Sequence, residues 1–255
     1  MNDINFTFGI ITNADNGANE HLKKSIASIV ELNIPKYEII IVGNKIHLEN
    51  EIIISSNDNI HVIDFDESIR PLWISKKKNL ITEKAKYENI VYLHDYISFD
   101  LNWYEGFKIF GDVFKACMTK IVNADGQRYR DWVIFPWFSC YGDDFIKGSK
   151  ELWNYSGIQN NESLIPYDEN NFNRHQYFSG AYWVAKKEIM QEIPLDESLL
   201  WGNGEDCIWS SSFSKKYEFS MNPHSSVHLL KWKQDAFGLI RPECHKKALE
   251  FISIK

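Results

Sequence analysis

Two adjacent carboxylates follow a glycine-rich stretch late in the chain. Residues 201–209 read WGNGEDCIW, so Glu205 and Asp206 come directly after a Gly-Asn-Gly run. A carboxylate held beside a hydroxyl can accept its proton as a general base. Acids are also favoured in the first turn of a helix, where the backbone dipole is positive. The two roles are compatible, and we expect a helix that begins here and aims a carboxylate into a site.

Short polar residues end three apolar runs in the first part of the chain. Thr12 and Asn13 follow FTFGII, Asn44 follows YEIIIVG, and Asp95 follows NIVYLH. Continuous apolar runs of this length are typical of buried parallel strands. Ligands of such sheets bind beyond the carboxyl ends of the strands, so the sequence predicts one nucleotide-sized crevice there. The alternatives are a turn at Asp95 and a helix entry at Thr12 and Asn13.

The order of these runs predicts the architecture. Helical spacing of apolar residues follows the first strand and stops before Pro35, and a second, lysine-rich helix is expected at 73–86. Strands alternating with helices indicate a mostly parallel sheet with helices on both faces. Further expected elements are strands at 6–12, 37–43, 61–65, 89–94 and 177–185, a helix from Trp103, a hairpin formed by KIVN and WVIF, and a short helix in KKEIMQEI.

Composition and charge narrow the class of protein. The 255 residues are 44% hydrophobic and 25% charged, which suits one large α/β domain. The net charge of −7 argues against a nucleic-acid partner. The four cysteines include no CxxC pair and are expected to be thiols in a reducing compartment.

Targeting features also point to the cytoplasm. The N-terminal MNDINFTF lacks a basic region followed by a long apolar run, so a secretory signal is not expected. No apolar stretch approaches the roughly 20 residues that span a bilayer. We therefore expect a cytoplasmic protein, with peripheral contact at the inner face of a membrane left open.

Four segments, in chain order, resemble the GT-A fold glycosyltransferases, particularly the large bacterial family 2 group. They are FTFGIITNADN, EIIIVGN, KKKNLITEKAKYENIVYLHDYISFD and FSGAYWVAKKEIM followed by LDESLLWGNGEDCIW. The last segment also resembles the Trp-Gly-x-Gly-Glu-Asp region of the β-1,4-galactosyltransferases. The resemblance covers roughly residues 4–232.

This resemblance implies a fold and an activity. The fold would be a single Rossmann-like GT-A domain over residues 1–255, with a nucleotide-binding half at 1–100 and an acceptor and catalytic half at 101–255. The activity would be inverting transfer of a sugar from a nucleotide-sugar donor, UDP-linked, to a glycan, a lipid-linked acceptor or another hydroxyl. The setting would be bacterial surface polysaccharide biosynthesis.

The resemblance also assigns roles to residues. Asp206 would be the base, and Glu205 would bind or orient the acceptor. Sugar and acceptor contacts would come from Trp201, Gly204 and Gly180. Nucleotide contacts would come from Thr12, Asn13, Asn44, Lys78, Asn79 and Asp95, of which Lys78–Asn79 matches the family's Arg-Asn pair.

A divalent cation, Mn²⁺ or Mg²⁺, is the implied cofactor, with Asp95 and His228 as ligands and His224 as the competitor of His228. The family's metal motif is usually Asp-x-Asp, whereas this chain reads His94-Asp95-Tyr96. A site with one carboxylate holds a hard cation less well than a site with two. The basic run SKKKN at 75–79 and Arg130 could neutralise part of a diphosphate's charge instead.

Two other functions remain open on the sequence. A non-catalytic glycosyltransferase-like module that binds glycans or a partner is favoured by Tyr96 and Asn44, which stand where acids are expected. A nucleotidyltransferase shares the parallel sheet. It would ordinarily carry a glycine-rich phosphate loop with a basic residue near the first strand, and NADNGANE lacks that pattern.

Overall fold

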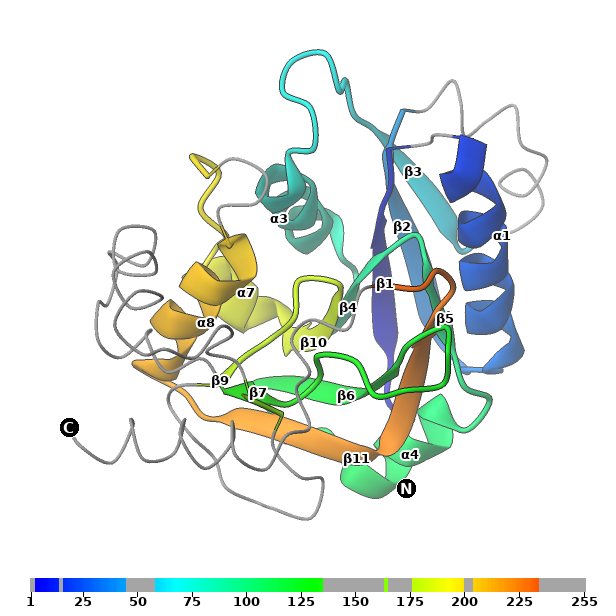
Figure 1. Ribbon diagram of the computed structural model, residues 1–255, viewed down its shortest axis with the longest axis vertical. Coiled ribbons are helices and arrows are strands. Elements are labelled where there is room, and N and C mark those ends of the chain that lie inside the picture. The colour runs from blue at the N-terminus through cyan, green and yellow to red at the C-terminus, as the bar shows by residue number, and fades with distance from the viewer. Residues whose placement is uncertain are drawn as a thin grey trace.

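The computed structural model describes residues 3–13, 16–44, 58–134, 163–164, 176–199 and 204–233. Figure 1 shows their arrangement. The elements in chain order are β1 (Phe6–Ile11), α1 (Asn16–Glu31), β2 (Tyr37–Gly43), β3 (Ile60–Asp64), α3 (Ile74–Lys84), β4 (Asn89–His94), β5 (Ile97–Phe99), α4 (Trp103–Phe110), β6 (Ala116–Val122), β7 (Val133–Ile134), β8 (Ser163–Leu164), β9 (Gln176–Tyr177), β10 (Tyr182–Lys186), α7 (Lys187–Glu192), α8 (Glu205–Ser214) and β11 (Phe219–Leu229).

One eight-stranded sheet organises the described residues, in the order β3-β2-β1-β4-β10-β6-β11-β5. Strands β3, β2, β1 and β4 run parallel, as predicted. Strand β10 is antiparallel to both β4 and β6, and β11 is parallel to β6. The pairing of β10 with β4 joins strands from both sides of residue 100 in one sheet. The predicted α/β fold with a mostly parallel sheet and flanking helices is confirmed.

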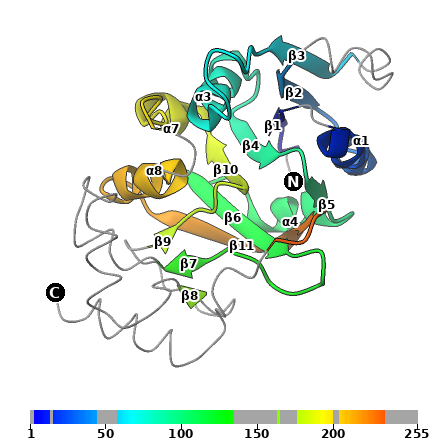
Figure 2. The same cartoon turned by 45° about the horizontal axis from the view of Figure 1, so that its top comes forward.

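Helices cover both faces of the parallel strands, with α1 on one side and α3 on the other (Figure 2). Every residue of β1 is buried, which explains its unbroken apolar sequence. Helix α3 packs on β1 so closely that a Cβ at Gly9 would overlap the side chain of Ile81. Glycine at this position therefore sets the height of α3, the helix that carries Lys77 and Lys78, above the sheet.

An aromatic cluster fills the core between α4 and the sheet. Trp103 is fully buried, and its ring centre lies 5.0 Å from that of Phe6 and 4.5 Å from that of Phe107. Its indole N–H donates to the hydroxyl of Tyr182 at 2.9 Å, which satisfies both polar groups inside the core. The helix predicted from Trp103 is thus confirmed and anchored to β10.

The predicted hairpin of KIVN with WVIF is wrong. Strand β7 pairs with β8 and β9 in a separate three-stranded sheet. After its turn the chain does pair with the end of β6, but through residues 127–129: Val122 and Arg128 form an antiparallel bridge, and Tyr129 N donates to Ile121 O at 2.8 Å. Strand β10 pairs only with the first residues of β6, and residues 127–129 take the edge beyond it before the chain reaches β7.

The strand predicted at 177–185 is split. Strand β9 ends at Tyr177 and β10 begins at Tyr182, so Ser179 and Gly180 lie in the break. This break places Gly180 at the start of β10, beside the carboxyl end of β4, because His94 N–H donates to Ala181 O at 3.1 Å. Two predicted thiols, Cys117 and Cys207, are buried, and none of the described helices is long and apolar enough to cross a membrane.

Candidate active site

The two acids of the WGNGED segment begin a helix, as predicted. Glu205 and Asp206 form the first turn of α8, and Gly204 is its N-cap residue. Gly204 has φ 70° and ψ 51°, in the left-handed region that favours glycine. One turn further along the helix, the buried Trp209 donates its indole N–H to Ile193 O at 2.8 Å and anchors α8.

The carboxylate of Asp206 is fixed by two backbone amides. Its Oδ2 accepts a hydrogen bond from Gly180 N at 2.6 Å, and its Oδ1 accepts one from Cys207 N at 2.8 Å. A Cβ at Gly180 would lie 2.9 Å from Asp206 Oδ2 and 3.1 Å from Glu205 Oε1. Only glycine allows both carboxylates to approach this close. The structure therefore brings together Gly180, Glu205 and Asp206, all predicted from the sequence.

Lys78 lies next to Gly180 and Glu205 and is completely buried. Its ammonium donates to Gly180 O at 2.9 Å, lies 3.8 Å from Glu205 Oε1 and sits 4.2 Å from the ring centre of Trp183. Burial lowers the pKa of Lys78, and the charges of Glu205 and Asp206 oppose that shift. Burial and the charge of Asp206 raise the pKa of Glu205, while Lys78 opposes that shift. Lys78 thus stabilises the anionic form of a buried carboxylate.

The ends of β1 and β4 form a second polar group. Thr12 Oγ1 donates to Asp95 Oδ2 at 2.6 Å, and both residues are buried. The parallel register places Ile11 opposite His94, so the residues that follow each strand become neighbours. The backbone of Thr12 also reaches β2, because Thr12 N donates to Val42 O at 3.1 Å. Asn44, which follows β2, therefore lies beyond the same edge of the sheet.

Lys77 completes this second group, although sequence reasoning selected Lys78 instead. Its ammonium donates to Thr12 O at 2.9 Å and to Asn13 Oδ1 at 3.1 Å, and it pairs with Glu67. Burial lowers the pKa of Lys77, and Glu67 and Asp95 oppose the shift. Two consecutive buried lysines are unusual in a helix, because lysine is almost never fully buried unless it is paired. The run of three lysines could not show which two face inward.

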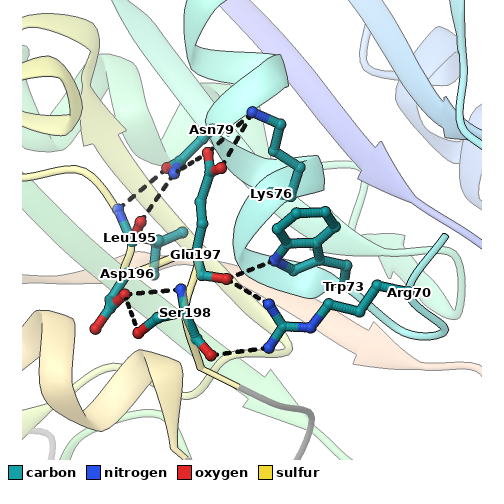
Figure 3. Close-up of polar contacts among 8 residues, drawn as sticks. All are labelled: Arg70, Trp73, Lys76, Asn79, Leu195, Asp196, Glu197 and Ser198. Atoms are coloured by element: carbon teal, nitrogen blue, oxygen red, sulfur yellow. Dashed lines mark hydrogen bonds and ion pairs between the residues drawn. The ribbon is translucent and has the colours of Figure 1, made fainter.

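Asn79 takes part in a different network, with the segment between α7 and α8 (Figure 3). Its side chain donates to Leu195 O at 2.8 Å and to Glu197 Oε1 at 3.0 Å, and it accepts from Leu195 N at 3.1 Å. This amide is thus engaged by the segment between α7 and α8. The structure does not bring Asn79 together with Thr12 and Asp95.

Arg70 and Trp73 hold the same segment (Figure 3). The Arg70 guanidinium donates to Glu197 O at 2.5 Å, to Ser198 O at 2.9 Å and to Leu199 O. The Trp73 indole donates to Glu197 O at 2.8 Å, and the guanidinium stacks 4.8 Å from its ring centre. These contacts anchor the chain shortly before α8. Trp201 lies outside the described residues.

The predicted metal ligands do not form a cluster in the part of the chain that the structure describes. His228 Nε2 lies 2.7 Å from Asp100 Oδ1, where β11 pairs with β5. The competitor His224 is exposed. No group of three or more His, Cys, Asp or Glu among the described residues could hold a metal ion. A hard divalent cation prefers several oxygen ligands, so these residues do not fit a resident cation, and we derive no step through one.

A third group that sequence reasoning missed lies beside Asp95. The buried Tyr96 ring stacks on His94 with ring centres 5.1 Å apart. The ammonium groups of Lys231 and Lys233 lie 4.2 Å and 4.3 Å from the centre of the Tyr96 ring. The signal in the sequence was HLLKWK, in which two lysines follow an apolar strand end within three residues.

Comparison with solved structures identifies the fold. GalNAc-T7 with UDP, GalNAc and Mn²⁺ aligns with a TM-score of 0.61 and 17% identity, over 98% of this chain and 48% of that chain. Residues 1–349 of S. aureus TarS align with a TM-score of 0.54 and 8% identity, over 98% of this chain and 65% of that chain. The fold is GT-A-like. A scan of protein-family models and a search of curated protein sequences both give no match.

These likenesses establish the GT-A-like fold alone, because the identities are low. The same TarS fragment in complex with UDP also aligns, with a TM-score of 0.52 and 9% identity over 98% of this chain and 65% of that chain. The chain spans about half of the GalNAc-T7 chain and 65% of the TarS fragment. In this chain the ends of β1, β2 and β4 share one edge of the sheet with the start of β10, and ligands of parallel sheets generally bind beyond the carboxyl ends of the strands.

Proposed function

We propose that this protein is a glycosyltransferase that moves a sugar from a nucleotide-sugar donor to a hydroxyl acceptor. One observation carries the proposal: the Thr12–Asp95 pair lies at the ends of β1 and β4, and the Gly180–Asp206 pair lies at the start of the neighbouring strand β10, where His94 N donates to Ala181 O. A polar group suited to a nucleotide thus lies beside a fixed carboxylate suited to a base. The GT-A-like fold and the order of the sequence segments support the same reading.

Asp206 is the base in this proposal. It accepts the proton of the acceptor hydroxyl while the hydroxyl oxygen forms a bond to the anomeric carbon of the donor sugar. The bond from that carbon to the diphosphate breaks, and its electron pair leaves on a phosphate oxygen. Attack opposite the leaving group inverts the anomeric centre. The amides of Gly180 and Cys207 hold the carboxylate in one orientation, which keeps it aimed at the acceptor.

Glu205 orients the acceptor. It shares the first turn of α8 with Asp206, and its raised pKa follows from burial beside a second carboxylate. Lys78 is a positioning residue, because it touches Gly180 and Glu205. Thr12, Asn13, Asn44 and Asp95 are assigned to the nucleotide, and Gly204 and Trp201 to the sugar. Asn79 is assigned a different role: its hydrogen bonds to the backbone of Leu195 hold the segment between α7 and α8.

We base the proposed substrates on the solved structures that this chain resembles and on the order of its sequence segments. A UDP-linked donor is proposed because both GalNAc-T7 and TarS are described with UDP. The acceptor is a glycan or a lipid-linked glycan, in bacterial surface polysaccharide biosynthesis, with the protein in the cytoplasm or peripheral at the inner membrane face. GalNAc-T7 is described with Mn²⁺. A divalent cation stays a sequence-based prediction here, since the described residues do not fit one.

A panel of nucleotide sugars tests the proposal. Release of the nucleoside diphosphate from one donor, with and without simple glycan acceptors, is the expected result. The alternative, a non-catalytic module, is favoured by Tyr96 at the position of an expected acid. Calorimetric titration separates the two functions, because the enzyme must bind a nucleoside diphosphate and the glycan-binding module need not.

A further inference from the structure

Lys231 and Lys233 approach the same ring from the end of β11. Their ammonium groups lie 4.2 Å and 4.3 Å from the Tyr96 ring centre, and Lys233 also donates to the Tyr96 hydroxyl. Neither forms an ion pair with a carboxylate of the described residues. Two like charges beside one ring repel each other, so a solvated surface would not hold them there without a reason.

The backbone builds this position. Asn123, itself buried, donates to Lys233 O at 2.6 Å and accepts from Lys233 N at 3.0 Å. Leu230 N donates to Tyr96 O at 2.8 Å. Backbone hydrogen bonds thus fix the chain on both sides of Lys231, and the positions of both lysines follow from them.

Positive charge is concentrated around this ring in a protein whose net charge is −7. Burial, with Lys78, Lys233, Lys231 and Lys77 adding to it, holds the pKa of His94 well below its usual range. Burial, with Lys231 and Arg130 adding to it, lowers the pKa of Lys233 to about 8, while Asp95 and Asp206 oppose that shift. The charge of Lys233 therefore interacts with the candidate nucleotide residue Asp95 and with the candidate base Asp206.

We propose that Lys231 and Lys233, carried on the ring of Tyr96, bind the diphosphate of the nucleotide-sugar donor and supply the cationic charge that its departure requires. This inference rests on the proposed function and names the part of that site which holds the phosphates. The ring that both ammonium groups contact belongs to Tyr96, the residue after Asp95, whose carboxylate accepts a hydrogen bond from Thr12. A nucleoside diphosphate is the ligand whose charge matches the pair.

The chemistry balances without a further reactant. The bond from the anomeric carbon to the phosphate oxygen breaks, and both electrons stay on that oxygen. The ammonium groups stabilise the new charge by hydrogen bonds and need not transfer a proton. The proton of the acceptor goes to Asp206, as above. Binding of the diphosphate would then need no divalent cation.

Calorimetric titration of the whole chain with UDP, GDP, ADP and dTDP tests this, each in EDTA and in Mn²⁺. The nucleotide that binds best is then compared with its monophosphate, in the wild type and in Lys231→Gln, Lys233→Gln and the double variant. We expect binding in EDTA, and a loss of about tenfold in diphosphate affinity for each substitution. The monophosphate affinity should change by less than about twofold, because its contacts lie with Thr12 and Asp95.

Matched variants keep the result interpretable. Lys84→Gln removes one exposed lysine charge from the end of α3 and should leave both affinities unchanged. Lys233→Arg keeps the charge and should restore most of the diphosphate affinity. Equal diphosphate and monophosphate losses in the double variant would mean a structural role and would overturn the inference.

The titrations distinguish a failure of this inference from a failure of the proposed function. Diphosphate binding that needs Mn²⁺ and ignores the lysine substitutions overturns the inference and leaves the glycosyltransferase proposal standing. Binding of no nucleotide under either condition overturns both. Binding in EDTA that is lost in the double variant supports both.

Discussion

Lys78 and Asp206 are bridged by the backbone of Gly180. The Lys78 ammonium donates to Gly180 O at 2.9 Å, and Asp206 Oδ2 accepts from Gly180 N at 2.6 Å. One residue in a break of the sheet thus ties α3 to α8. The bridge fixes the carboxylates of the site relative to the strand ends that hold Thr12 and Asp95, and several predictions depend on it.

Gly180→Ala should impair turnover more than stability. The added Cβ would lie 2.9 Å from Asp206 Oδ2, so the first turn of α8 must shift. We expect kcat to fall by about a hundredfold, the loss typical of a misplacement near 1 Å. Gly111→Ala is the matched control, because Gly111 has φ 90° but no atom within 4 Å of the new Cβ. The control should lower the melting temperature and leave kcat unchanged; a similar kcat for both variants would contradict the role of the bridge.

Lys78→Met should destabilise the fold. The substitution leaves the largely buried Glu205 without its cation and removes a hydrogen bond from Gly180 O. We expect a loss of about 3 kcal/mol in the free energy of unfolding at neutral pH, measured by urea denaturation. Adding Glu205→Gln should recover part of that loss, because no buried charge then lacks a partner. Losses that simply add in the double variant would show that the two residues are not coupled.

Diphosphate affinity should fall as the pH rises through about 8. Burial lowers the pKa of Lys233 to about 8, and Lys231, Arg130, Asp95, Asp206 and the Tyr96 ring face it. The ligand binds the protonated form, so the dissociation constant should rise above pH 8, by at most about tenfold per pH unit. Lys233→Arg should flatten the profile between pH 7 and 9.5, since arginine stays charged. An unchanged slope in that variant would assign the titration to another group.

Arg70→Lys should weaken the site through the segment it anchors. Arg70 donates to three backbone carbonyls between residues 197 and 199. A lysine ammonium cannot reproduce that planar fork. We expect the free energy of unfolding to fall by about 1–2 kcal/mol and kcat to fall with little change in diphosphate affinity. Loss of diphosphate binding of the same size would place Arg70 at the nucleotide instead.

The sequence predicted the parts of the fold that depend on local pattern. The apolar runs gave β1, β2 and β4, and the acids at Glu205 and Asp206 gave the start of α8. The meeting of Thr12 with Asp95 followed from parallel strands, whose carboxyl ends share an edge. These features need only periodicity and the geometry of a sheet.

What the sequence could not show depends on partners far along the chain. The predicted hairpin failed because residues 127–129 return along the end of β6, and β7 pairs instead with β8 and β9, which come later in the chain. Which side of α3 each of its polar residues faces is settled by packing, so Lys77 and Asn79 could not be placed. Lys231 and Lys233 were missed because their target, Tyr96, lies on another strand end.

The most direct test of the central claim is turnover of the best donor by Asp206→Asn. We expect sugar transfer to fall by about a thousandfold, within the range for loss of a general base. Nucleoside diphosphate affinity should stay within about twofold of the wild type, which also shows that the variant is folded. Normal transfer by Asp206→Asn would contradict the assignment of Asp206 as the base and, with it, the proposed mechanism.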